Sequence, residues 1–304
     1  MAADGNVTVV IAVKNGEPFI AEAVRSALSQ GDHVTRVVVV DDGSTDGSLA
    51  SVAALNDRRV ITMQNPGRGV SAARNFGAQQ ADTQWLLFLD ADDRLVEGAV
   101  HLLLAAAARE PSAVVAYGDY ERIDRTGRRA GRRFLLRSRA KPSGAILNRL
   151  VRGNFIINGG IAIVDRDVFW SLGGFDPRLS LCEDWHLLCR LAAAGSFVYT
   201  ADRVMDYREH SSSVMMIRGR RYQDFEPALK AIFSDSGVLA QLPSEDVAPA
   251  RRDAEVSLMT YCAMQAIRNG ATSTGIGIAR EAMRHRRAKT PWVMLRVAGA
   301  LVGI

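Results

Sequence analysis

Three groups of acidic residues in this sequence have a spacing that could do chemistry. Asp41-Asp42 follows directly on an apolar run, Asp90-Ala91-Asp92-Asp93 follows on another, and Glu183-Asp184 stands where an amphipathic pattern begins. Two carboxylates about 4 Å apart repel each other by roughly 4 kcal/mol at an effective dielectric constant of about 20. A divalent cation removes that repulsion, and hard oxygen ligands suit Mg²⁺ or Mn²⁺. The second group therefore predicts a metal site, to which a diphosphate would add further oxygens.

Each acidic group also has a simpler explanation, and these explanations stay open at this point. Aspartates after a strand can cap the next helix, and Asp-Gly-Ser is common in turns. Acids in the first turn of a helix are favoured by its dipole. For Glu183-Asp184 the functional alternative is that one carboxylate is a general base, a role worth about 10²–10⁴-fold in rate. Because the pattern of the first two groups occurs at two strand ends, we favour a function for both.

The segments around these acids predict alternating strands and helices. Apolar, β-branched runs predict buried strands at 7–13 and 37–40, and two further strands are expected at 60–63 and 85–89. Between them, apolar residues recur at helical spacing, in helices expected after Pro18, after a cap at Ser44 or Thr45, over 70–80 and over 96–108. Such alternation in units of about 30 residues implies right-handed βαβ crossovers and a parallel sheet. Ligands bind outside the carboxyl ends of such strands, so the five aspartates are expected to meet in one crevice.

The pattern is looser after residue 110. It predicts a strand over 113–120, an apolar run over 159–170, a turn and an amphipathic helix within 173–194, and a strand pair over 197–208. Beyond about Met215 only helical segments are expected. The predicted fold is therefore α/β, with a mostly parallel central sheet flanked by helices and a helical C-terminal extension. We divide the chain into a domain of residues 1–214, with halves of about 1–110 and 111–214, and a helical region of 215–304.

Composition limits the possible classes of protein. The chain has 304 residues, is 48% hydrophobic and carries a formal charge of +5, enough for one large domain with an appendage. A modest basic excess can favour nucleic acid, anionic lipid or phosphorylated ligands without choosing among them. The three cysteines, Cys182, Cys189 and Cys262, form neither a metal-type pair nor an even disulfide set, and are expected to be small core residues. Neither a signal sequence nor an apolar stretch of about 20 residues is present, so we expect a cytoplasmic protein.

Two further features have weaker signals. The stretch Gly67–Ala72 matches a dinucleotide fingerprint by letter, but it follows the third predicted strand and a proline turn, so we discount that meaning. Its loop would instead let the backbone approach a phosphate, with Arg68 or Arg74 as nearby cations. His210 is either a metal or phosphate ligand or a structural histidine.

Two basic segments leave alternatives open. Arginines crowd residues 122–141, which form either a solvated loop or a flap over an acceptor site that favours anionic acceptors; its basic members are Arg122, Arg125, Arg128, Arg129, Arg132, Arg133, Arg137, Arg139 and Lys141. In the tail, a basic cluster precedes an apolar segment that begins at Trp292. As a helix this segment is about 20 Å long, too short to span a hydrocarbon core of about 30 Å. It either lies on an anionic membrane surface or packs on the body or on a partner subunit.

Taken in order, several blocks resemble the family-2 inverting glycosyltransferases of the GT-A fold, over about residues 6–213. The blocks are VVIAVKNGEPFIAEAVRSALSQ, VVVVDDGSTDGS, GRGVSAARNFGA, WLLFLDADD, GGFDPRLSLCEDWHLLCRLAAAG and YREHSSS. Each block is only moderately specific, whereas the ordered set is highly so. The resemblance implies a nucleotide-sugar donor, a glycan or lipid-linked cell-surface precursor as acceptor, and Mn²⁺ or Mg²⁺ as cofactor. It implies no nucleic-acid partner, and the oligomeric state stays open.

The resemblance also implies roles for donor-binding residues. The end of the first strand, Ala12 to Lys14, would hold the nucleotide base together with Asp42, and Asp41 would support that loop. Arg74 falls where a basic residue commonly lies near the nucleotide.

For the reaction itself, the resemblance makes Asp90 and Asp92 the residues that contact ribose and metal-diphosphate, with Asp93 as the other metal ligand. Asp184 would be the catalytic base, with Glu183 beside it. An acceptor oxygen would then displace the nucleoside diphosphate with inversion.

Two departures from the family pattern carry information. Members usually have Pro and Tyr where this chain has Ala12 and Lys14, so stacking on the base, worth about 1–3 kcal/mol, is absent or replaced. The nucleotide therefore stays open, with UDP expected. Processive members have a Gln-x-x-Arg-Trp motif, whose nearest match here, Gln265 to Asn269, lacks the tryptophan. We therefore expect a non-processive enzyme.

Two other classes of protein fit the sequence less well. A sugar nucleotidyltransferase needs a glycine-rich loop with Arg and Lys after the first strand, which AVKNGEPF does not supply. A non-catalytic nucleotide-sugar-binding protein is disfavoured by the presence of Asp90, Asp92 and Asp184.

Overall fold

The computed structural model describes residues 6–130, 140–156, 159–210 and 221–301. The chain divides into two compact units. The first comprises residues up to 121 together with 140–146 and 156–208, and the second comprises 122–139, 147–155 and 209–304.

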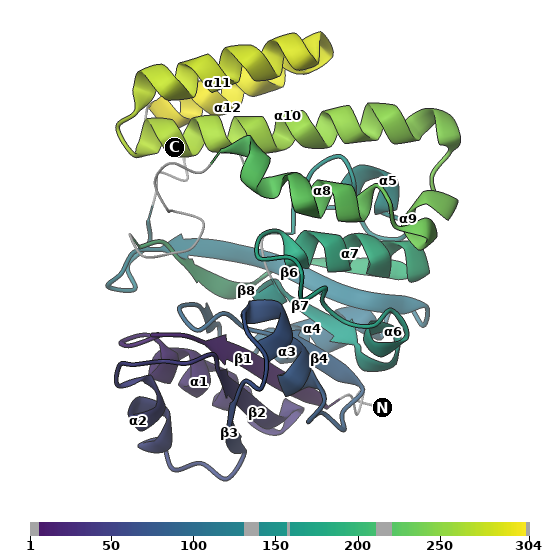
Figure 1. Ribbon diagram of the computed structural model, residues 1–304. Helices are drawn as coiled ribbons and strands as arrows, with labels where there is room; N and C mark the ends of the chain where they lie inside the picture. The colour runs from purple at the N-terminus through teal and green to yellow at the C-terminus, as the bar shows by residue number, and fades with distance from the viewer. Residues whose placement is uncertain (1–5, 131–139, 157–158, 211–220, 302–304) are drawn as a thin grey trace. The chain divides into compact units, whose positions relative to one another are not determined.

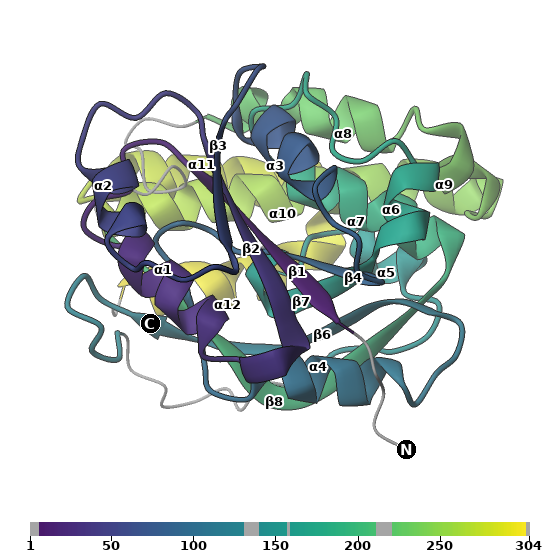
Figure 2. The same cartoon turned by 90° about the horizontal axis from the view of Figure 1, so that it is seen from below.

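The first unit is built on one mixed sheet with helices packed on it (Figures 1 and 2). Its strands are β1 (Val7–Val13), β2 (Val34–Asp41), β3 (Val60–Gln64), β4 (Trp85–Phe88), β5 (Arg94–Leu95), β6 (Ala113–Ile123), β7 (Ala162–Asp165) and β8 (Ser196–Arg208). They lie in the order β3-β2-β1-β4-β7-β6-β8-β5. β1 pairs in parallel with β2 and β4, and β2 with β3. The pairs β4–β7, β6–β7 and β5–β8 are antiparallel. The predicted α/β class is confirmed, and the sheet is parallel in its N-terminal half.

The inner strands of the parallel half, β1, β2 and β4, are largely buried on both faces, whereas the edge strand β3 is partly exposed. Val37, Val38, Val39 and Val40 of β2 all have an exposed fraction of 0%, as the unbroken β-branched run predicts. The helices of this unit are α1 (Ile20–Leu28), α2 (Ser48–Ala53), α3 (Val70–Ala78), α4 (Ala99–Ala107), α6 (Arg166–Ser171) and α7 (Glu183–Ala194). α3 packs on β1 and β2, and Gly77 makes this possible, since a Cβ there would lie 2.5 Å from Val10 Cγ1.

Three details of the predicted elements are wrong. Ser44 and Thr45 do not cap α2, because this helix begins at Ser48. They hold the loop after β1 instead. Asn15 N donates to Ser44 Oγ at 2.9 Å, and Thr45 N donates to Asn15 Oδ1 at 2.8 Å. The expected strand pair over 197–208 is the single strand β8. The helix expected from residue 96 begins at Ala99, because Gly98 with φ of 72° precedes it and β5 takes up Arg94–Leu95.

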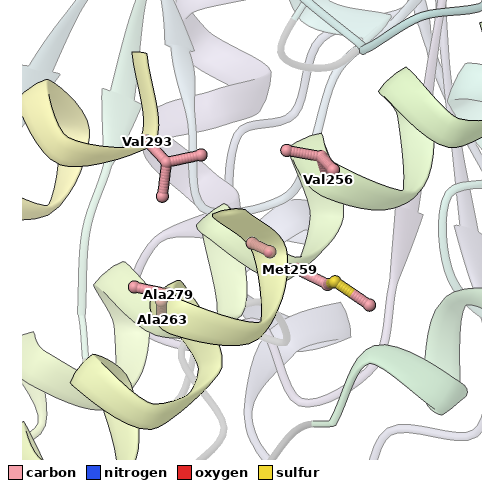
Figure 3. Packing of buried hydrophobic residues seen from close by; sticks show 6 residues of the cluster. Val256, Met259, Ala263, Ala279 and Val293 are labelled. Carbon is pink, nitrogen blue, oxygen red and sulfur yellow. The ribbon is translucent and has the colours of Figure 1, made fainter. Parts of the chain in front are cut away.

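The second unit is helical. Its helices are α5 (Leu147–Leu150), α8 (Glu226–Ile232), α9 (Ser236–Ala240), α10 (Ser244–Arg268), α11 (Thr272–His285) and α12 (Thr290–Leu301). Small residues let α11 lie close to α10, and Val293 of α12 joins their shared core of Val256, Met259, Ala263, Ala279 and Ala282 (Figure 3). Buried charge on α10 is paired, because Arg152 Nη1 lies 3.0 Å from Asp253 Oδ2. Within the described residues, every helix falls short of the length and apolar character that a membrane span requires.

Candidate active site

The predicted aspartates lie at the carboxyl ends of neighbouring parallel strands. β1 lies between β2 and β4 in the sheet, and β2 ends opposite Val13 at Asp41. Asp42 N donates to Val13 O at 2.8 Å, and Leu89 N donates to Val10 O at 3.0 Å. The strand order reverses at β1, and this is where open α/β sheets bind ligands. The sheet therefore carries both aspartate groups to the same edge.

Asp41 and Asp42 hold two loops at this edge. Asp41 has an exposed fraction of 2%, and its carboxylate accepts from Ser44 N at 3.0 Å. Asp42 Oδ1 accepts from Gly69 N at 3.0 Å and from Asn65 Nδ2 at 2.6 Å. Since a carboxylate has about four lone-pair sites, Asp42 keeps capacity for a further donor. The loop that contains Gly69 is thus attached to the end of β2 through the carboxylate of Asp42.

The two residues predicted from the end of β1 differ in their surroundings. Ala12 is half-buried and packs against the apolar cluster of Val38, Val40 and Ala73. Lys14 follows β1 and is exposed. Their role in holding a nucleotide base stays a prediction.

Asp90, Asp92 and Asp93 form a group that fits a divalent cation. One carboxylate oxygen from each lies within 4.8 Å of the others. These are hard oxygen donors, as Mg²⁺ and Mn²⁺ prefer. Burial raises the pKa of Asp90, and repulsion by Asp92 raises it further, while Arg74 opposes both effects. The concentration of negative charge that the sequence predicted is therefore present.

Arg74 connects this acidic group to the start of α7. Its Nη2 lies 2.6 Å from Asp90 Oδ1, and its Nη1 lies 2.8 Å from Glu183 Oε1. The guanidinium is 5.3 Å from the centre of the Phe175 ring, and the residue is only 6% exposed. The structure thus brings together two of the three acidic groups singled out in the sequence. A direct contact of Arg74 with a nucleotide stays a prediction.

Asp184 lies in the first turn of α7 and is half-buried. Burial raises its pKa to about 7, and the neighbouring Glu183 adds to the rise, while Arg74 lowers it. Trp185 N donates to Asp184 Oδ1 at 2.7 Å. The preceding Cys182 has φ of 55°, a conformation that L residues seldom adopt, so packing must hold the helix start in place. A carboxylate with a pKa near neutral pH has the proton affinity that a general base needs.

Arg208 is a residue of this site that the sequence reasoning missed. Its backbone N donates to Asp93 Oδ1 at 2.7 Å, and its Nε donates to Asp92 O at 2.8 Å. Its Nη2 lies 2.6 Å from Glu22 Oε2 on α1. The contact arises because β5 pairs with the end of β8 and brings the aspartate loop against it. The only signal in the sequence was the place of Arg208 in the YREHSSS block.

Of the remaining predicted residues, some belong to the second unit and some lie outside the described residues. His210 belongs to the second unit and is half-buried, and its role as a metal ligand stays a prediction. Of the arginine-rich segment, Arg132, Arg133, Arg137 and Arg139 lie outside the described residues. Arg122 lies in β6, and Arg128 lies in the turn that follows this strand, with Asp124 N donating to Arg128 O at 2.8 Å.

Lys141 is the last residue of the arginine-rich segment 122–141, and it does not lie in a solvated loop. That alternative is therefore wrong for this residue. Its Nζ lies 3.1 Å from Asp119 Oδ1. It also lies 5.9, 5.5 and 6.0 Å from the centres of the Tyr117, Tyr120 and Tyr199 rings. An ammonium group among aromatic faces is attracted by their quadrupoles, so Lys141 is an anchoring residue.

Comparison with known proteins shows the family of the chain. The family model described as Glycosyl transferase family 2 matches residues 8–173, more than half of the 304 residues. The chain belongs to glycosyl transferase family 2.

Curated relatives match parts of the chain. The succinoglycan biosynthesis protein ExoU of Rhizobium meliloti is 31% identical over 211 residues, which are 64% of this chain and 59% of that protein. An uncharacterized glycosyltransferase of Rickettsia felis is 26% identical over 213 residues, 67% of this chain and 34% of that protein. The chain therefore covers less than two thirds of the length of either relative.

Solved structures agree in fold. TarS of S. aureus superposes with a TM-score of 0.62 at 17% identity, over 97% of this chain and 54% of that chain. The mannosyltransferase PcManGT of Pyrobaculum calidifontis, in complex with GDP-Man and Mn²⁺, superposes with a TM-score of 0.61 at 18% identity, over 98% of this chain and 86% of that chain. The predicted GT-A fold is confirmed.

Proposed function

We propose that this protein is a non-processive, inverting and metal-dependent glycosyltransferase. It transfers a sugar from a nucleoside-diphosphate sugar, with UDP as the expected nucleotide, to a hydroxyl of a glycan or lipid-linked acceptor. The observation that carries the proposal is Arg74, which links the carboxylate group of Asp90 to Glu183 beside the half-buried Asp184. Donor-binding and base chemistry thus belong to one network. Residues 1–214 are proposed as the transferase domain and 215–304 as its helical region.

The donor assignment draws on the structural neighbours. TarS has been crystallised with UDP and with UDP-GlcNAc, and PcManGT with GDP-Man and Mn²⁺. The three carboxylates of Asp90, Asp92 and Asp93 would hold the cation, which when bound neutralises charge on the departing diphosphate. Whether the sugar is a hexose or an N-acetylhexosamine is left to a donor screen.

Asp184 is the proposed base. Its carboxylate takes the proton of the acceptor hydroxyl, whose oxygen forms a bond to the anomeric carbon. On the opposite face the bond from that carbon to the diphosphate oxygen breaks, so the configuration inverts. Burial and the charge of Glu183 raise the proton affinity of Asp184, and Arg74 keeps it from rising further. Both acids in the first turn are favoured by the dipole of α7.

The test has two parts. Nucleotide sugars are screened for binding by thermal shift with and without Mn²⁺, and the donor found is then used to assay transfer by Asp184→Asn. We expect donor binding to survive and transfer to fall about 10²–10⁴-fold, the usual contribution of a general base. Asp167→Asn is the matched control, since its side chain is 86% exposed. Undiminished turnover by Asp184→Asn would refute the assigned base, and no shift with any nucleotide sugar would refute the proposed donor.

A further inference from the structure

The last helix of the described chain has two apolar stripes, of which only one is covered. Val293, Val297 and Ala300 follow the spacing i, i+4, i+7 and pack on α10 and α11. Met294, Ala298 and Leu301 repeat that spacing one residue further on, and all three are exposed. The prediction that this segment packs on the body is therefore correct for one face of α12.

The exposed stripe is unusual for this molecule. Among the described residues, five large hydrophobic side chains are exposed, and four of them are on α12: Trp292 at 39%, Met294 at 59%, Leu295 at 58% and Leu301 at 52%. A helix that is apolar all round is normally buried on all sides. A contiguous exposed apolar patch of this kind marks an interaction surface.

Positive charge accompanies the patch. The residues from Thr272 to Leu301 include six arginines and lysines, Arg280, Arg284, Arg286, Arg287, Lys289 and Arg296, and one acid, Glu281. Arg286 is engaged by Asp253 of α10. Arg284 is exposed in the last turn of α11, and Arg287 is exposed in the turn before α12. Lys289 Nζ lies 5.9 Å from the centre of the Trp292 ring. The apolar stripe therefore starts beside a cluster of cations.

We propose that the exposed face of α12 binds the surface of an anionic membrane, with the helix lying in the interfacial plane. The apolar side chains enter the boundary of headgroups and acyl chains, the amphipathic Trp292 lies at headgroup level, and the cations before α12 face lipid phosphates. The 12 described residues of α12 measure about 18 Å as a helix, less than a hydrocarbon core of about 30 Å. A second copy of this chain is a poorer occupant, because a twofold contact would place the same cationic turns near each other. This inference goes beyond the proposed function and does not depend on it.

The test uses the full chain and two kinds of vesicle, one of phosphatidylcholine alone and one that also contains phosphatidylglycerol. We expect flotation with the anionic vesicles only, and release by added salt, because the attraction of the cations is screened. Leu295→Gln should abolish flotation, while Ile61→Gln, which changes an exposed hydrophobic residue of the first unit (36% exposed), should leave it unchanged. Arg287→Gln and Lys289→Gln should each weaken binding about fivefold.

These substitutions are preferable to deleting residues 289–304, since deletion would also remove the buried Val293 and Ala300. Unfolding curves of each variant check that the fold is kept. Equal binding to both kinds of vesicle, or binding that Leu295→Gln leaves intact, would overturn the proposal. A concentration-dependent dimer that Leu295→Gln dissociates, without vesicle binding by the parent protein, would assign the face to a second copy instead.

Discussion

Arg74 and Glu183 are 109 positions apart in the sequence, yet Arg74 Nη1 lies 2.8 Å from Glu183 Oε1. The same guanidinium contacts Asp90 through Nη2. One buried cation thus joins the acidic group suited to a metal with the acid pair at the start of α7. The proposed catalysis depends on this link, because the charge of Arg74 acts on carboxylates at both ends.

Removing the charge of Arg74 should move the pH dependence of activity. Arg74 lowers the pKa of Asp184, and Asp184 must be deprotonated to act as a base. In Arg74→Gln the pKa of Asp184 rises, so the acid limb of kcat/KM moves to higher pH, whereas Arg74→Lys keeps the charge and should stay near the parent limb. The Gln variant should also lose about 3–5 kcal/mol of stability, as is typical when a buried ion pair is broken. An unmoved acid limb in Arg74→Gln would contradict this role.

Asp184 should make the protein less stable as the pH rises. Its pKa is about 7 in the folded protein against an ordinary value of 3.8. The folded state therefore holds the proton more tightly, and stability is lost progressively from about pH 4 to above pH 7. Asp184→Asn removes this penalty, so the variant should exceed the parent by up to roughly 4 kcal/mol at pH 8, at about 1.4 kcal/mol per pKa unit. Denaturant unfolding at pH 4 and pH 8 tests this: a stability difference that does not grow with pH would count against the raised pKa of Asp184.

Arg208 should determine how well the carboxylates bind a cation. Its side chain and backbone hold Asp92 O and Asp93 Oδ1, and residues that orient ligands in this way typically contribute about 10–100-fold to metal affinity. We expect Arg208→Met to weaken Mn²⁺ binding by that factor, measured directly by electron paramagnetic resonance of free Mn²⁺. Arg203→Met is the control, since Arg203 pairs with Glu121 and Asp206 on the same sheet. Equal losses in both variants would indicate a general structural effect instead.

Two helical glycines should respond to alanine in opposite directions. At Gly77 a Cβ would lie 2.5 Å from Val10 Cγ1 and 3.0 Å from Val40 Cγ2, whereas at Gly277 nothing lies within 4 Å. Gly77→Ala should therefore destabilise the protein by about 1–3 kcal/mol through overpacking of α3 on the sheet. Gly277→Ala should stabilise it by up to about 1 kcal/mol through helix propensity. Thermal unfolding of the two variants side by side checks both signs, and a neutral Gly77→Ala would mean that α3 can move away from β1.

The amino-acid sequence by itself determined the elements that carry the site. The apolar runs of β1, β2 and β4, and the acids that follow β2 and β4, were readable because a strand covered on both faces needs continuous apolar residues, whereas the residues beyond its end can be charged. The family blocks and the start of α7 at Glu183 were also readable, because each is carried by a short continuous stretch of sequence. Where local signals competed, prediction failed: Gly98 rather than apolar spacing sets the start of α4.

Only the tertiary structure decided which of these residues meet. Nothing local to Arg74 points to Glu183, and nothing local to Arg208 points to Asp93, because such contacts depend on how helices and strands far apart in sequence pack together. The same holds for α12, which has apolar residues on more than one face, so that only packing against α10 and α11 distinguishes its covered stripe from its exposed one. Periodicity tells which residues share a face, whereas the partner of that face is set by the fold as a whole.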